Sequence, residues 1–125
     1  MKFWVVPAVL AVPALALACG ACDEDKVAAT YDHAVVQAAA AQKKQMVFCE
    51  VQGLVTPARM RAAAARVAGI DASSVRVSTD PAAVSFALDP KVQSADAAAS
   101  KVASRLGGGV KILVLKVPVP ASPAG

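Results

Sequence analysis

The sequence contains few of the side chains on which most active sites depend. Its 125 residues include one histidine, three cysteines, one tryptophan, one tyrosine and three phenylalanines. There is no Ser-His-Asp arrangement, no histidine-rich zinc motif and no glycine loop between a strand and a helix. We therefore expect a protein that is not an enzyme.

Concentrated charge is also scarce. The net charge is only +4, the basic side chains are spread along the chain, and the one short basic run is Lys43-Lys44. Nucleic-acid binding normally needs a concentrated basic face or a platform of aromatic rings on which bases stack. We expect no nucleic-acid partner.

No apolar run reaches the roughly 20 residues of a stable transmembrane helix. The longest covers residues 3–18, is preceded by Lys2, is interrupted by Pro7 and Pro13, and ends on Ala16-Leu17-Ala18. A cationic start, an apolar centre and a small-x-small end are typical of a secretory signal. The sequence predicts a signal peptide over residues 1–18 and a periplasmic or secreted protein.

Cleavage after Ala18 would make Cys19 the first residue of the mature chain. A lipoprotein signal is the alternative, although it prefers leucine three places before the cysteine, where Ala16 stands. Lipidation of Cys19 would anchor the protein to a membrane leaflet, and it is the one route by which we expect a membrane partner.

Residues 19–45 are expected to hold a Cys-x-x-Cys segment and one helix. Asp23, Glu24 and Asp25 suit a helix start because they oppose the macrodipole, and the helix should run to about residue 42. Thr30 and His33 fall on its polar side. Its predicted apolar stripe consists of Val27, Tyr31, Ala34, Val35 and Ala38.

Residues 46–117 carry alternating strand and helix signals. Strands are expected at 46–52, 74–79, 84–88 and 110–117, and helices at 59–68, after an N-cap at Thr56, and at 94–106. The order βαββαβ after one extra helix predicts an α+β protein, a ferredoxin-like sandwich with an extra N-terminal helix. Residues 118–125 hold three prolines and should form a disordered tail.

The last predicted strand is apolar on both faces. Ile112 and Val114 lie on one face, and Leu113 and Leu115 on the other. Because a sheet face of this kind must be covered, we expect the extra helix to lie opposite the other two helices. A dimer that buries the same face is the alternative.

The stretch 47–117 resembles the heavy-metal-associated domain of copper chaperones and metal-transporting ATPases. The similar segments are Val51-Gln52-Gly53-Leu54, Val67-Ala68-Gly69-Ile70 and Asp89-Pro90. Metal-binding members carry two cysteines after that first glycine, and Thr56 and Arg59 stand at those positions here. Neither is a soft-metal ligand, so the resemblance implies the fold without the usual metal site.

Cys19-Gly20-Ala21-Cys22 also resembles the start of small exported proteins of proteobacteria, which implies that both cysteines belong to the mature protein. Two thiols at this spacing can chelate copper(I), or contribute two of the four ligands of zinc. A structural or incidental role of the pair is the alternative. Thiol redox chemistry ranks lower, because no strand precedes the motif and the acidic residues 23–25 oppose thiolate formation.

His33 and Cys49 are weaker candidates. His33 follows Cys22 by eleven residues, about 16 Å along a straight helix, which is too far to share one ion. Cys49 lies on the apolar side of a strand, which favours a small buried side chain, with pairing to Cys22 as the alternative.

These observations lead to one main hypothesis and two others. The main one is an exported module that binds copper or zinc through Cys19 and Cys22. The second is a metal-free module that docks a partner protein of the cell envelope through its sheet face or its alanine-rich helices. The third, less favoured, is a thiol redox protein.

Overall fold

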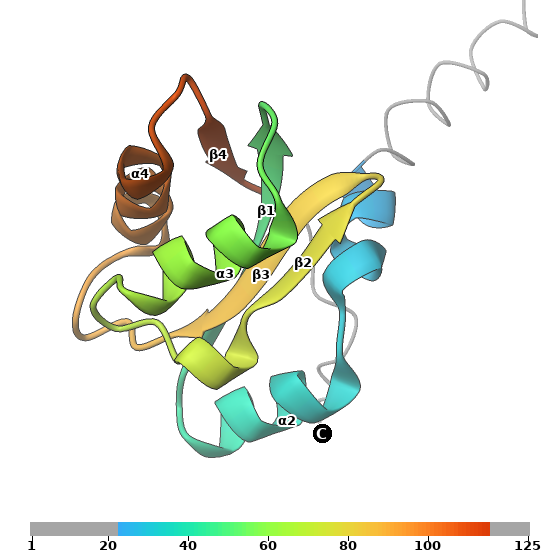
Figure 1. Ribbon diagram of the computed structural model, residues 1–125. Coiled ribbons are helices and arrows are strands. Elements are labelled where there is room, and N and C mark those ends of the chain that lie inside the picture. Colours follow the sequence, from blue (N-terminus) through green and yellow to red (C-terminus); the bar gives the residue numbers. More distant parts are fainter. Residues whose placement is uncertain (1–22, 116–125) are drawn as a thin grey trace, which may run out of the picture.

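The computed structural model describes residues 23–115. Its four strands form one antiparallel sheet in the order β2-β3-β1-β4. This order, with a helix after β1 and another after β3, is the ferredoxin-like α+β arrangement predicted from the sequence (Figure 1). The elements are a helical segment at 23–30, α2 (His33–Ala41), β1 (Gln45–Gln52), α3 (Pro57–Ala65), the short helix η2 (Ala72–Ser74), β2 (Arg76–Thr79), β3 (Ala82–Leu88), α4 (Ala95–Leu106) and β4 (Lys111–Val114).

The ends of the helices follow local side-chain chemistry. Thr56 caps α3 by accepting a hydrogen bond from the Arg59 amide, and Pro57 occupies the first turn. Ser94 caps α4 in the same way, and Gly107 ends it. Within residues 23–115, none of the helices has the length and apolar character needed to cross a bilayer. The predicted leader and tail lie outside the described residues.

The first face of the sheet forms the main core. In the two central strands, Val47 pairs with Phe86 and Cys49 pairs with Val84, and all four side chains are buried. They belong to one apolar cluster with Met60 of α3 and Val102 of α4, among other residues. The periodicity of the strands therefore places α3 and α4 on this face.

The second face of β1 and β3 is buried as well. Phe48 is 4% exposed and Ser85 is fully buried, although neither belongs to the main core. The Ser85 hydroxyl donates a hydrogen bond to the carbonyl of Thr30, and α2 contacts both central strands. The N-terminal helices therefore cover this face, as predicted, but the side chain of Leu113 in β4 remains 43% exposed.

The prediction of a single helix over residues 23–42 was wrong. The chain leaves the helical conformation at Tyr31 and Asp32, and a second helix, α2, starts at His33. Asp32 is extended, and its Oδ1 accepts hydrogen bonds from the amides of Ala34 and Val35. An aspartate that satisfies the amides ahead of it starts a new helix instead of continuing the old one.

The break also changes which side chains are buried. Thr30, predicted on the polar side, is buried, while Ala34 and Ala38 of the predicted apolar stripe are exposed. Val27 is buried as expected, and in α2 the buried residue is Ala39. Two short helices at an angle present different faces to the sheet, so one helical period cannot describe both.

Three ion pairs link the N-terminal helices and the turn after them to the rest of the domain. Lys26 Nζ lies 3.3 Å from Glu50 Oε1, Arg76 Nε lies 3.0 Å from Asp32 Oδ2, and Lys44 Nζ lies 3.7 Å from Asp71 Oδ2. Exposed pairs add little stability individually. The Asp32 carboxylate differs because one oxygen caps α2 while the other binds the Arg76 guanidinium of β2.

Phe48→Ala tests whether both faces of the sheet are buried. We expect this substitution to lower the free energy of unfolding by about 3–5 kcal/mol, similar to Phe86→Ala on the first face, because each removes a buried ring. Leu54→Ala, at a side chain that is 95% exposed, is the control and should change it by less than about 0.5 kcal/mol. Urea denaturation measures all three, and a Phe48→Ala effect no larger than the control would show that the second face is open.

Two capping aspartates should make the fold sensitive to acid: Asp32, which caps α2, and Asp71, which caps the short helix η2. The hydrogen bond from Arg76 lowers the pKa of Asp32 below its ordinary value of 3.8, and hydrogen bonds from Ser73 lower the pKa of Asp71. As the pH falls, these carboxylates therefore take up protons in the unfolded chain before they do so in the folded one. The stability that they contribute is present above pH 3.8 and is lost as the pH falls through their pKa values in the folded state. Thermal unfolding between pH 7 and pH 2 should show a smaller acid-induced loss for Asp32→Asn than for the natural chain. Equal losses would contradict the assignment.

Candidate functional site

The loop between β1 and α3 is the place where the heavy-metal-associated resemblance locates a metal site. Gly53 has a positive φ of 120°, and a side chain there would meet the Cα of Val110 at 3.2 Å. Thr56 is occupied as the N-cap of α3. Arg59 donates a hydrogen bond of 3.0 Å to the carbonyl of Leu106 at the end of α4. The two positions that would hold cysteines therefore serve helix capping and helix-to-helix contact, and they do not fit a soft metal.

Cys19 and Cys22, the predicted metal ligands, lie outside the described residues. Cys49 is the one cysteine that the structure describes, and it is a buried free thiol with 1% exposure. Burial and, to a smaller extent, the charge of Asp96 raise the pKa of Cys49 to about 12. It is therefore a protonated core residue at neutral pH, as the sequence predicted, and not a ligand.

His33 is exposed at the start of α2, as predicted. Its Nδ1 lies 3.3 Å from the hydroxyl of Tyr31, and the two rings are tilted by 40°. Across residues 23–115, no three His, Cys, Asp or Glu side chains are placed to hold a metal ion together. The described part of the chain thus offers no complete metal site of its own.

The structure brings together a set of cations that the sequence analysis treated as dispersed. Two shallow hollows, of 440 and 260 Å³, lie between α3 and α4 and share Arg66 and Arg105 in their walls. We call this surface the α3–α4 groove. It is lined by the basic residues Arg59, Arg66, Lys101 and Arg105, with Ala62, Ala63, Val67, Ala68, Ser104 and Leu106 between or beside them.

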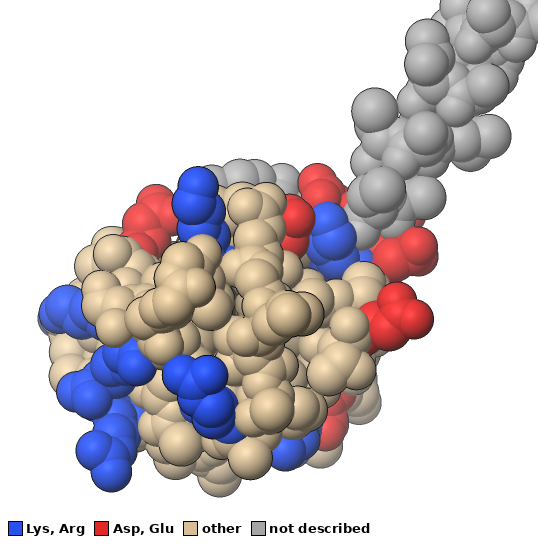
Figure 2. Space-filling model, turned by 45° about the horizontal axis from the view of Figure 1, so that its top comes forward, with Lys and Arg blue, Asp and Glu red and all other residues tan. Residues whose placement is uncertain are grey.

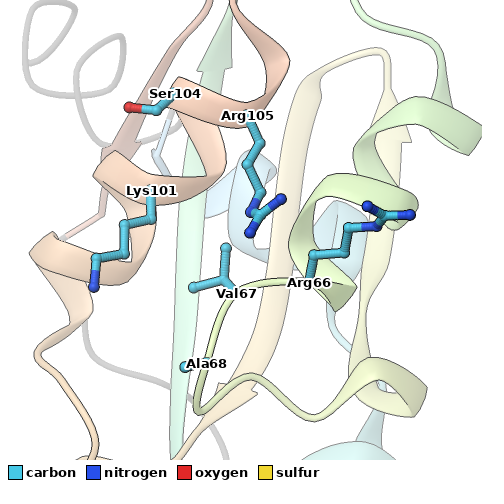
Figure 3. Close-up of a pocket in the computed structure, with 6 residues that line it drawn as sticks. All are labelled: Arg66, Val67, Ala68, Lys101, Ser104 and Arg105. Carbon is cyan, nitrogen blue, oxygen red and sulfur yellow. The ribbon is translucent and has the colours of Figure 1, made fainter.

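The arrangement of the groove follows from helical spacing. Arg59 and Arg66, the C-cap residue of α3, are seven residues apart, and Lys101 and Arg105 of α4 are four apart, so each pair lies on one side of its helix. In Figure 3, Arg105 reaches from α4 toward Val67 in the gap between the helices, whereas the Ser104 hydroxyl and the side chains of Arg66 and Lys101 point outward, away from it. The sequence shows these two spacings, but only the packing of α3 against α4 brings the two pairs of basic residues onto one surface.

No protein-family model matches the sequence, and no curated protein matches it. Among solved structures, the chain is similar to a copper-binding domain from HMA7, a P-type ATPase, with 16% sequence identity and a TM-score of 0.48. The similarity covers 57% of this chain and 93% of that one.

The burial of Cys49 predicts its reactivity. In a Cys19→Ser/Cys22→Ser variant, Cys49 is the remaining thiol, and its high pKa and burial should keep it from reacting with a colorimetric disulfide reagent at pH 8. Unfolding the same sample in denaturant should release one reactive thiol per chain. Rapid reaction of the folded variant would show that Cys49 is accessible and would restore it as a candidate ligand.

Proposed function

We propose that this protein is an exported module that binds a soft metal ion through the thiolates of Cys19 and Cys22, and that it prefers copper(I) to zinc. The observation that carries the proposal is the Cys-x-x-Cys spacing in a chain whose third cysteine is buried in the core. Two thiolates are sufficient for linear copper(I), whereas a closed zinc site needs two further ligands.

The described residues support this assignment by elimination. Thr56 and Arg59 stand where metal-binding heavy-metal-associated domains carry their two cysteines, and both side chains make hydrogen bonds within the fold. The Cys49 thiol stays protonated, which removes it as a competitor. The cysteine pair precedes the helical segment 23–30, which the Lys26–Glu50 ion pair links to the second face of the sheet.

Metal titration of the reduced mature protein tests the proposal. We expect it to bind one copper(I) per chain in competition with a chromophoric chelator under anaerobic conditions, and to bind zinc more weakly. Cys19→Ser/Cys22→Ser should abolish copper binding, while the matched variant Cys49→Ala should retain it, provided that circular dichroism shows both to be folded. Equal copper binding by the Cys19→Ser/Cys22→Ser variant would refute the proposal, as would an intact mass of the exported protein that lacks Cys19 or carries acyl groups on it.

A metal-free interaction module is the second candidate. The covered sheet face argues against docking through β1 and β3, since Phe48 and Ser85 are already buried there. The alanine-rich helices α3 and α4 remain available on their outer side, and the α3–α4 groove is the observation that favours this function. This function requires neither Cys19 nor Cys22.

A further inference from the structure

The α3–α4 groove carries four basic side chains, from Arg59, Arg66, Lys101 and Arg105. The ion pairs among the described residues use Lys26, Lys44 and Arg76, none of which belongs to α3 or α4. In Figure 2 the basic side chains gather on the side of the molecule that carries α4, and the acidic ones lie along the upper and right-hand edges.

Such an arrangement points to an anion outside the domain. Like charges held on one face repel each other and lower the stability of the fold, unless a ligand of opposite sign is bound there. Three of the four cations are arginines, and all four residues are exposed. Arginine presents a planar fork of donors that matches the two oxygens of a carboxylate, which a lysine ammonium does not.

The shape and lining of the groove select among anionic partners. No aromatic residue lines either hollow, so there is no platform for nucleic-acid bases. The large exposed apolar side chains of the described residues are Leu54, Val92 and Leu113, and none lines the groove to insert into lipid. Two adjoining shallow hollows suit an extended chain better than a single enclosed ion.

We propose that the α3–α4 groove binds an extended acidic segment of a partner polypeptide. Arg66 and Arg105, which line both hollows, form the centre of the site and pair with glutamate or aspartate side chains. Arg59 lines the smaller hollow and Lys101 the larger one, so that they extend the positive surface on either side of this centre. The proposal does not depend on metal binding at Cys19 and Cys22.

Fluorescence anisotropy with a labelled oligoglutamate peptide tests it, with an oligoglutamine peptide of equal length as the control probe. We expect Arg66→Glu/Arg105→Glu to weaken binding of the oligoglutamate by about tenfold or more. The matched variant Lys43→Glu/Lys111→Glu makes the same change in net charge at exposed residues outside the groove, and it should retain most of the affinity. Arg66→Gln/Arg105→Gln provides a milder loss of charge if the first variant fails to fold.

Other outcomes would overturn the proposal. Equal weakening by the two charge-reversal variants would show attraction by net charge alone. If inorganic phosphate displaces the peptide at a concentration similar to that at which the peptide itself binds, the groove is a site for small anions. If the protein binds phosphatidylglycerol vesicles but not the peptide, the groove is a membrane-binding surface. The Cys19→Ser/Cys22→Ser variant should bind the peptide as the natural chain does, so that a failure of the metal proposal is distinguishable from a failure of this one.

Discussion

The two central strands of the sheet, β1 and β3, bury side chains on both faces, and the rest of the structure is arranged around this constraint. Alternating residues such as Phe48 and Cys49 point to opposite sides, and both are buried. The crossover helices α3 and α4 cover one side. The opposite side requires a second cover, which explains why the βαββαβ unit is preceded by the helices of residues 23–41.

Because the N-terminal helices cover the opposite face, α3 and α4 form one of the two outer layers around the sheet. Their inner sides supply Met60 and Val102 to the core, while their outer sides carry the arginines and the lysine of the α3–α4 groove. The layer formed by α3 and α4 thus packs against the core on its inner side and carries positive charge on its outer side.

The sequence was sufficient to predict the topology but not the details that depend on packing. The caps at Thr56 and Ser94 and the alternation in β3 are local signals, and they located all three elements, although α3 ends at Ala65 instead of residue 68 and β3 begins at Ala82 instead of residue 84. The break at Asp32 was missed because an apolar stripe can be drawn through residues 27–38 as one helix. Its cause is partly remote: the carboxylate also binds Arg76, 44 residues away in the chain.

The candidate sites divide in the same way. The buried state of Cys49 and the exposure of His33 follow from strand and helix periodicity. The α3–α4 groove was not predicted, because residues 59–66 and 101–105 become neighbours only after both crossover helices pack on one face. Cys19 and Cys22 remain a prediction from sequence spacing.

Ser85 shows how a single polar atom can set alignment. The helical segment 23–30 ends at Thr30, where a helix leaves carbonyl oxygens without partners, and the Ser85 hydroxyl meets one of them at the buried second face of the sheet. Apolar contact alone would tolerate sliding of the segment by a fraction of a turn. A directional bond at its terminus does not, so Ser85 fixes where the covering helix stops along β3.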